Sequence, residues 1–356
     1  MDYIEIKGYK SIKNAKVFLK PINILIGANG SGKSNFLSFF DFLNRLYHQK
    51  LTEYVALSGG EEKMLHMGSK ITQSISAKLK FGLNAYSFEI TKGQDSFIFT
   101  SEGLWYDNNP YLIDPIEISD FKNEAKIKTD SLPRADYIRK YLNSFAKYHF
   151  HDTGQNSPFN SSTHIDSDSL VLYDKGENLA PILLKIKKEH PKIYNRIVKN
   201  IQSIAPYFSD FVLEPNENGY LKLFWQDKYR PYNYGVNDLS DGTIRFIALA
   251  VLFMQPNLPK IIVLDEPELG LHPMAIAKLS GMIQAASSNE SQVIIATQSA
   301  DLISYFEPED IIAIDQKDGC TVFNRLNTED LKLWLVDYSL GDLWQRNIIN
   351  KAQPFN

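Results

Sequence analysis

A glycine-rich segment with the pattern G-x-x-x-x-G-K-[ST] runs from Gly27 to Ser34. It follows the apolar run 22–26, and residues 35–43 after it place apolar side chains at helical spacing. Glycines let backbone N–H groups point at phosphate oxygens, and the N-terminus of the following helix adds a positive end. Lys33 can then reach the β- and γ-phosphates, and the Ser34 hydroxyl can ligate Mg²⁺. The segment therefore predicts a nucleotide-phosphate cradle.

The predicted nucleotide contacts all lie on this loop and at the start of its helix. They are Asn29, Gly30, Ser31, Gly32, Lys33, Ser34 and Asn35. The glycine spacing, G-x-x-G-x-G followed by Lys-Ser, differs from that of the dinucleotide-binding fingerprint. The pattern therefore favours a nucleoside triphosphate over a dinucleotide.

A second apolar run, residues 261–264, ends in the acidic pair Asp265 and Glu266. Asp265 is predicted to hold Mg²⁺, directly or through water, at the carboxyl end of a strand. Glu266 is expected to orient or deprotonate the water that attacks the γ-phosphate. A buried strand before an acidic turn has the same pattern, but its pairing with the upstream cradle favours a Walker B strand.

Residues 239–243, Leu-Ser-Asp-Gly-Thr, stand before the apolar helical stretch 244–253. Ser240 is predicted to cap that helix, whose N-terminus would attract an anion. The position of this segment shortly before the acidic pair resembles the signature motif of ABC-type ATPases, in which the phosphate loop and the signature of two protomers close on one nucleotide. The resemblance implies that Ser240 and Gly242 contact the nucleotide of a partner.

The segments after the acidic pair complete this resemblance, with two departures from it. Residues 268–273 resemble a D-loop, and a predicted buried strand at 292–296 leads to Gln298 where most ABC relatives have the switch histidine. Glutamine can donate a hydrogen bond to a γ-phosphate oxygen but cannot take a proton near neutral pH, which implies slow or differently gated hydrolysis. Asp241 replaces a common glycine, and we expect Arg245 to offset its charge.

With these motifs in this order, the chain resembles the RecF/OLD/SMC-type branch of ABC ATPases, soluble heads that act in DNA repair and phage defence. More narrowly, it is similar nearly end to end to bacterial RecF-like AAA ATPases, on the segments 148–153, 239–243, 265–273 and 296–299. The resemblance implies an α/β P-loop NTPase fold of ABC/SMC-head type, with a mixed sheet, a flanking antiparallel β-subdomain and a helical second lobe. It also implies ATP and Mg²⁺ as ligands.

Three regions are expected along the chain. Residues 1–114 would form the first part of the ATPase lobe with Walker A, residues 115–235 a helical second lobe, and residues 236–356 the rest of the ATPase lobe. Short alternating runs within 71–106 predict antiparallel strands. The insertion carries no sustained heptads, which excludes long coiled-coil arms. The C-terminal part is too short and too poor in clustered acids for the Toprim nuclease of OLD enzymes.

The 356-residue chain is 44% apolar and 22% charged, enough to bury a large core. It has no apolar run of membrane-spanning length and no cleavable leader, so we expect a cytoplasmic protein without a membrane partner. Its single cysteine, Cys320, excludes an internal disulfide. The net charge of −4 argues against a wholly basic nucleic-acid module. Lysine clusters within 7–16 and 185–199 either contact phosphates or form solvated faces.

His149, His151 and Asp152 form another group that could do chemistry. In an extended segment both rings lie on one face, and the aspartate could join them on a metal. No further set of ligands with matching spacing accompanies them. A packed or interfacial role is therefore favoured over a metal site.

The leading hypothesis is an ATPase that dimerises head to head around two nucleotides. Each γ-phosphate would meet Lys33 and Ser34 of one chain and Ser240 and Gly242 of the other, so binding closes the dimer and hydrolysis releases it. This cycle would drive or gate a DNA-repair or phage-defence assembly, with possible nucleic-acid contacts. The alternative is a nucleotide-gated scaffold or sensor that holds a separate effector, such as a nuclease, and hydrolyses ATP slowly. A transporter subunit is the third and least favoured interpretation.

Overall fold

The core of the protein is a six-stranded sheet with the order β17-β16-β3-β15-β14-β8. The computed structural model describes residues 1–93, 96–106 and 114–349. The core strands are β3 (Ile22–Ile26), β8 (Ala146–Tyr148), β14 (Ile261–Asp265), β15 (Gln292–Ala296), β16 (Ile311–Lys317) and β17 (Cys320–Arg325). Neighbouring strands are parallel except β16 and β17. All of β3 is buried, because a central parallel strand is covered on both faces.

The parallel strands bring the ends of several predicted motifs to one edge of this sheet. In the strand register, Asp265 at the end of β14 is opposite Ala296, and Leu264 is opposite Tyr148. On the other side of β15, Ala296 is opposite Leu25 of β3. The loops that follow these four strands therefore start side by side, which is where ligands bind in open α/β sheets.

The flanking sheet is antiparallel, with the order β2-β1-β4-β5-β6-β7, as the alternation in residues 71–106 predicted. Its strands are β1 (Tyr3–Tyr9), β2 (Ile12–Phe18), β4 (Ser74–Phe81), β5 (Asn84–Lys92), β6 (Phe97–Tyr106) and β7 (Ile116–Glu117). Helix α1 (Lys33–Tyr47) packs between the two sheets. Its Phe42 contacts Tyr9 and Phe88 of the flanking sheet, and its Phe40 contacts Phe145 just before β8. This aromatic layer fixes the helix that follows the phosphate loop.

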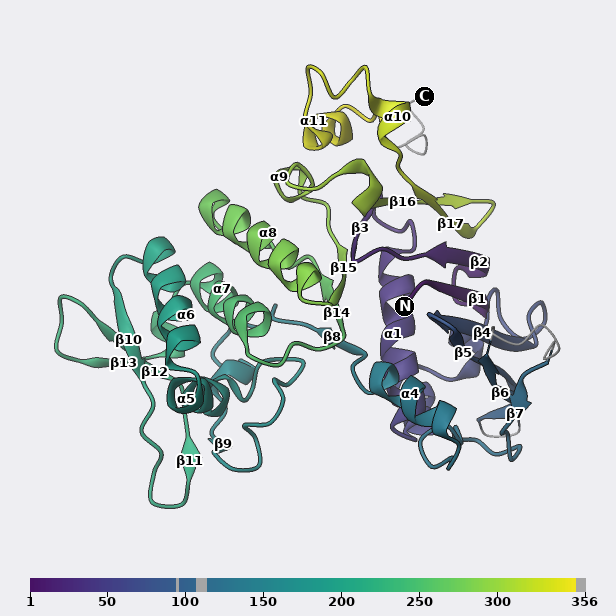
Figure 1. Cartoon of the computed structure of the whole chain (residues 1–356), viewed down its shortest axis with the longest axis horizontal. Coiled ribbons are helices and arrows are strands. Elements are labelled where there is room, and N and C mark those ends of the chain that lie inside the picture. Colours follow the sequence, from purple (N-terminus) through teal and green to yellow (C-terminus); the bar gives the residue numbers. More distant parts are fainter. Residues whose placement is uncertain (94–95, 107–113, 350–356) are drawn as a thin grey trace.

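A second group of helices forms the helical lobe at the left of Figure 1. Its helices are α5 (Leu179–Glu189) and α6 (Pro191–Ile204), and they pack with α7 (Asp241–Met254), which in turn packs against α8 (Pro273–Ser288). Small sheets join them, made of β10 (Phe208–Val212), β12 (Phe224–Asp227) and β13 (Asn233–Gly235), and of β9 (Thr163–His164) and β11 (Tyr220–Leu221). Nearly all of α7 is apolar because it is enclosed by α6 and α8.

The first elements of the expected insertion lie with the ATPase lobe. β7 pairs with β6, helix α4 (Pro133–Leu142) packs against α1 and β5, and β8 pairs with β14. We therefore propose that the helical insertion starts near residue 149, instead of residue 115 as expected from the sequence.

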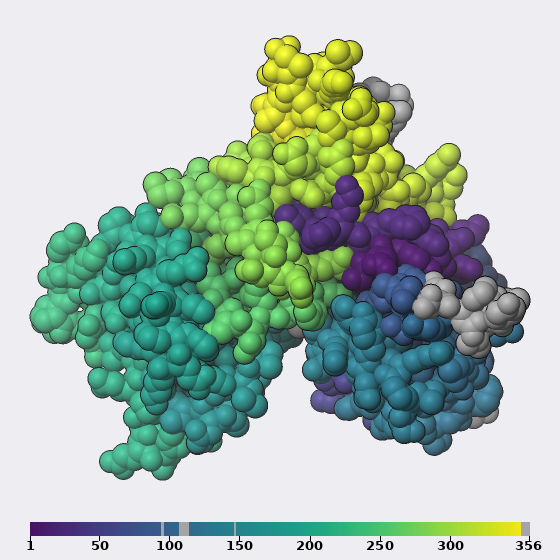
Figure 2. Space-filling model, viewed as in Figure 1, coloured from purple at the N-terminus to yellow at the C-terminus, as the bar shows by residue number. Residues whose placement is uncertain are grey.

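The remaining elements are short. They are α2 (Leu51–Leu57), α3 (Glu61–Met64), α9 (Ala300–Ile303), α10 (Thr328–Leu331), α11 (Leu340–Gln345) and three single turns of 3₁₀ helix at Pro158–Asn160, Val236–Asp238 and Pro308–Asp310. Helix α10 is a single turn, and turns follow it to residue 337. Figure 2 shows this C-terminal part, in yellow, projecting from one end of the molecule. Within the described ranges, no helix combines the length and apolar character needed to cross a membrane.

Candidate nucleotide-binding site

The predicted phosphate loop connects β3 to α1. Gly30 and Gly32 have φ of +82° and +109°, backbone conformations that glycine adopts without strain. Gly27 and Gly32 are also close to other backbone and side-chain atoms, since a Cβ would overlap the Ile314 carbonyl oxygen at Gly27 and the Thr321 hydroxyl at Gly32. The glycines are therefore required by the turn itself and by its packing against β16 and β17.

Lys33 lies folded over its own loop. Its Nζ donates to the carbonyl oxygens of Gly27, at 2.5 Å, and Ala28, at 3.0 Å. Burial lowers the pKa of Lys33, while the negative charges of Glu266 and Asp265 act in the opposite direction. The predicted phosphate-binding cation and both predicted acids therefore lie within electrostatic reach of one another.

The other predicted loop residues divide into exposed and enclosed ones. Asn29, Gly30 and Ser34 are exposed, and the Ser34 hydroxyl has no hydrogen-bond partner among the described residues. Ser31 is buried, and its Oγ is likewise unpartnered in the described part of the chain. The exposed tip and the Ser34 hydroxyl are accessible to a ligand.

The Asn35 side chain is hydrogen-bonded within its own chain. Its Nδ2 donates to Ser11 Oγ at 2.7 Å, and Ser11 Oγ lies 2.7 Å from Thr321 Oγ1. Asn35 therefore connects the start of α1 to the β1–β2 turn and to β17. Its predicted nucleotide contact is untested and stays a prediction.

Asp265, the predicted magnesium ligand, is the last residue of β14. Its Oδ2 lies 3.3 Å from Nζ of Lys147 on the neighbouring strand β8. Its backbone oxygen lies 2.9 Å from Nε2 of His151, in the loop after β8. Sequence reasoning missed Lys147, because nothing in the pattern shows that its strand pairs with β14.

Glu266 and Gln298, the predicted base and switch residue, are in direct contact. Gln298 Nε2 donates to Glu266 Oε1 at 2.7 Å. The backbone N–H of Glu266 donates to the Ala296 carbonyl oxygen at 2.8 Å, and its φ is +41°, an uncommon value for a residue other than glycine. Such strain persists only where neighbouring contacts fix it, as the bond to β15 does here.

Glu268 is a buried acid whose role the sequence did not indicate. The Thr297 hydroxyl donates to its Oε1, whereas its Oε2 is buried without a partner among the residues described. Burial raises the pKa of the Glu268 carboxyl to about 6, and the nearby charge of Glu266 acts in the same direction. The hydrogen bond between Thr297 and Glu268 therefore links the D-loop to the end of β15, next to Gln298.

The signature segment begins α7 as predicted, with Ser240 as the N-cap. Ser240 Oγ accepts a hydrogen bond from the Thr243 N–H at 3.2 Å, and Ser240 is exposed. A Cβ on Gly242 would overlap the carbonyl oxygen of Gly270, so the helix start packs directly on the D-loop of the same chain. Among the described residues, no hydrogen bond joins segments 239–243 and 27–34.

Arg245 does not form the expected ion pair with Asp241. Its guanidinium donates instead to the carbonyl oxygens of Leu269, at 2.9 Å, and His151, at 3.0 Å. The expectation was wrong because it considered only residues close in sequence. Arg245 connects the signature helix, the D-loop and the loop after β8.

The rings of His149 and His151 lie together, with their centroids 4.5 Å apart. Burial lowers the pKa of His149, and the neighbouring His151 and Lys147 act in the same direction. The residues described include no cluster of three or more His, Cys, Asp or Glu arranged for a metal ion. The bond from His151 to the Asp265 backbone agrees with a packing role.

Comparisons with known proteins agree with this geometry. Residues 22–304 match the family described as "AAA domain, putative AbiEii toxin, Type IV TA system". The chain is 22% identical over 365 residues to the Old nuclease of Escherichia phage P2; the match covers 92% of this chain and 61% of that protein, so the chain spans about three fifths of its length.

Solved structures of SMC heads share the fold. One is an SMC head bound to the C-winged helix domain of ScpA, with a TM-score of 0.56 and 17% identity over 92% of this chain and 98% of that one. Another is an SMC head with an extended coiled coil bound to the C-terminal domain of ScpA from Pyrococcus furiosus, with a TM-score of 0.55 and 17% identity over 94% and 98%. These likenesses confirm the predicted ABC/SMC-head fold. The chain belongs to this AAA-domain family and has the fold of RecF/OLD/SMC-type P-loop ATPases.

Proposed function

We propose that two copies of the chain bind two ATP–Mg²⁺ between them, hydrolyse the nucleotide and use this cycle to drive or gate a DNA-repair or phage-defence assembly. One observation carries the proposal: four predicted residues meet at the carboxyl edge of the core sheet. Lys33 lies within electrostatic reach of Asp265 and Glu266, and Glu266 is bonded to Gln298. A cation, a metal-binding acid, a base and a polar switch are what phosphoryl transfer to water requires.

The oxygen donors present fit Mg²⁺. The hydroxyl of Ser34 and the carboxylate of Asp265 are hard oxygen ligands, and Mg²⁺ usually takes only one or two from protein. When bound, the ion would neutralise charge on the phosphates. Lys33 would exchange the neutral carbonyl oxygens of Gly27 and Ala28 for an anionic phosphate oxygen, because the phosphate adds the attraction of an opposite charge to the hydrogen bond.

Glu266 would act as the base that orients the attacking water. Gln298 fixes one carboxylate oxygen of Glu266 through its amide, which leaves the other oxygen for water. A glutamine cannot hold the proton that Glu266 receives. We therefore expect slow chemistry and a long-lived ATP state.

The exposed N-terminus of α7 supports a nucleotide shared between two chains. Ser240 and Asp241 are exposed, and Gly242 packs on Gly270 of the D-loop. The guanidinium of Arg245 is hydrogen-bonded to the backbone of His151, in the loop after β8. The His151 ring in turn is hydrogen-bonded to the backbone oxygen of Asp265. The signature that would serve the partner's nucleotide is thus connected to the chain's own Walker B strand.

A nucleotide-gated scaffold for a separate effector is the second candidate. Gln298 at the switch position favours it, because slow turnover suits a timer more than a motor. The phage P2 relative is named a nuclease, and this chain spans about three fifths of it. A nuclease effector, nucleic-acid contacts and a cytoplasmic location stay predictions. ATP hydrolysis that DNA stimulates would favour the first candidate, an ATP cycle that drives an assembly. A stable ATP-dependent complex with a partner protein would favour the scaffold.

Mixing two inactive variants tests the shared site. Lys33→Ala lacks the phosphate-binding cation but keeps its signature, and Ser240→Arg blocks the signature but keeps its phosphate loop. Each variant alone should hydrolyse no ATP, whereas the mixture should regain activity because one composite site in each mixed dimer is intact. Mixing Lys33→Ala with the double variant Lys33→Ala/Ser240→Arg is the control and should stay inactive. A Ser240→Arg protein with normal turnover would refute the shared site.

A further inference from the structure

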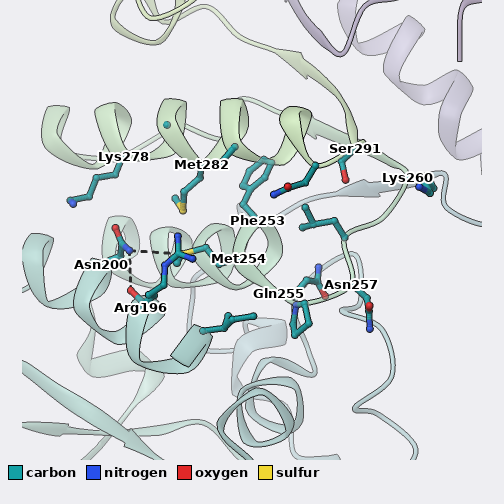
Figure 3. Close-up of a pocket in the computed structure, with 16 residues that line it drawn as sticks. Arg196, Asn200, Phe253, Met254, Gln255, Asn257, Lys260, Lys278, Met282 and Ser291 are labelled. Atoms are coloured by element: carbon teal, nitrogen blue, oxygen red, sulfur yellow. Dashed lines mark hydrogen bonds between the residues drawn. The ribbon is translucent and has the colours of Figure 1, made fainter. Parts of the chain in front are cut away.

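A groove lies between helices of the two lobes, away from the nucleotide-binding edge. It has a volume of about 830 Å³ and is lined by α6, the end of α7, the loop after it and one face of α8 (Figure 3). Lys260 and Ser291 in its wall immediately precede β14 and β15, whereas Asp265 is the last residue of β14 and Gln298 follows the other end of β15. The groove therefore opens at the opposite end of the core sheet.

The groove is cationic with an apolar floor. Phe253, Met254 and Met282 contribute apolar surface, and Arg196 and Lys278 project from α6 and α8 at one end (Figure 3). None of its sixteen lining residues is acidic. Neither Arg196 nor Lys278 forms an ion pair within the described part of the chain. A ligand with acidic and apolar groups would complement this surface.

The floor has room where α8 carries a glycine. A Cβ added to Gly281 would have no atom within 4 Å. Glycine lowers helix stability relative to residues with side chains, and no positive φ or close packing requires it here. The open space at Gly281 is thus available to an entering side chain.

The same chain carries a surface with the complementary chemistry. We call residues 329–338, most of α10 and the turns that follow it, the C-terminal knob. Leu333, Trp334 and Val336 in it are 87%, 46% and 78% exposed. Single exposed apolar residues are ordinary, but three within four positions form a patch that suggests an interaction site. Figures 1 and 2 show the C-terminal part that contains the knob projecting at the top of the molecule.

The knob is also acidic. Glu329, Asp330 and Asp337 carry negative charge, and Lys332 is its one cation. Lys332 lies 4.0 Å from Glu329 in an exposed pair, which holds the two charges only weakly. The charge of the knob is therefore opposite to that of the groove.

We propose that the C-terminal knob of one copy docks in the groove of a second copy. Trp334 and Leu333 would enter the apolar floor, where the flexible methionines Met254 and Met282 can adapt to them. The acidic residues of the knob would face Arg196 and Lys278. No residue of the knob lines the groove of its own chain.

This contact joins two different surfaces, so it is head to tail. A pair of chains joined in this way still has one unoccupied knob and one unoccupied groove. Further copies can therefore add until a ring closes, or a filament grows. The contact uses no residue of the nucleotide site, so it is independent of ATP. It would link the nucleotide-shared dimers into a larger assembly.

Sedimentation of Lys33→Ala without nucleotide tests the contact apart from the nucleotide-dependent dimer. The mass should rise with concentration above that of one chain. Gly281→Gln fills the groove and Leu333→Asp places a charge on the knob; each should weaken association about tenfold or more. The exposed substitution Lys13→Glu is the matched control and should not change it. A single-chain mass at every concentration, or association that neither variant weakens, would overturn the proposal.

A charge-reversal pair tests the head-to-tail geometry. Arg196→Glu/Lys278→Glu reverses the groove, and Glu329→Lys/Asp330→Lys reverses the knob, all in the Lys33→Ala background. Each protein alone should be monomeric, with an unchanged melting temperature that shows it is folded. Their mixture should associate, because the intact knob of one fits the intact groove of the other. A mixture that stays monomeric contradicts the assigned surfaces.

Discussion

The buried carboxyl of Glu268 should make the free energy of unfolding depend on pH. Burial raises its pKa from 4.5 to about 6 in the folded protein. Between these values the folded chain binds more protons than the unfolded chain, so stability falls as pH rises and the loss is complete above about pH 6. A shift of this size corresponds to about 2 kcal/mol.

The substitution Glu268→Gln isolates this effect. Glutamine can still accept the Thr297 hydrogen bond through its carbonyl oxygen but carries no charge at any pH. Near pH 4.5 the variant and the wild type should be about equally stable. Near pH 7.5 the variant should be more stable by about 2 kcal/mol, since it avoids the cost of burying a carboxylate.

Denaturant titration of both proteins without nucleotide, repeated across this pH range, gives the difference in unfolding free energy. Other titrating groups contribute equally to both proteins and cancel in the difference. Glu329→Gln, at an exposed position, is the matched control for loss of one charge. A wild-type-to-Glu268→Gln difference that stays constant between pH 4.5 and 7.5 would refute the buried-carboxylate argument.

Three further substitutions test other contacts. Gly32→Ala should lower stability by about 2 kcal/mol or more in thermal unfolding, because its φ of +109° strains alanine and its Cβ overlaps the Thr321 hydroxyl. Gln298→Ala removes the bond that orients Glu266, so single-turnover ATP hydrolysis should slow by about tenfold to a hundredfold while ATP affinity, measured by calorimetry, changes little. Arg245→Lys cannot bond both the Leu269 and His151 carbonyls, so it should cost about 1–3 kcal/mol in denaturant unfolding and should weaken ATP-dependent dimerisation seen by sedimentation.

The parts of the site that local patterns describe were predictable. The cradle from Gly27 to Ser34, the strand before Asp265 and the cap at Ser240 each depend on residues adjacent in sequence, and the structure forms the loop, strand and helix at these places. The comparisons confirm the fold that these motifs indicated.

The contacts between distant segments were not predictable from those patterns. Lys147 meets Asp265 only because β8 pairs with β14, and Glu268 meets Thr297 only because β14 pairs with β15. Arg245 was expected to act on its neighbour Asp241, yet its longer reach brings it to two backbone carbonyl groups. Pairing across a sheet decides these contacts, and one sequence carries no direct signal of it.

These contacts connect the two nucleotide sites of the proposed dimer. Within one chain, Asp265 is bonded to His151, His151 to Arg245 and Arg245 to the D-loop at Leu269, on which the signature helix packs. A ligand shifts a conformational equilibrium only if it binds the two conformations with different affinity. A metal ion bound at Asp265 would act at the first of these contacts and could in this way favour one conformation. We therefore expect nucleotide bound by one phosphate loop to position the signature that serves the other nucleotide. Coupling of this kind is reciprocal, so the two nucleotides should bind cooperatively, and Arg245→Lys should abolish the cooperativity while leaving a first nucleotide bound.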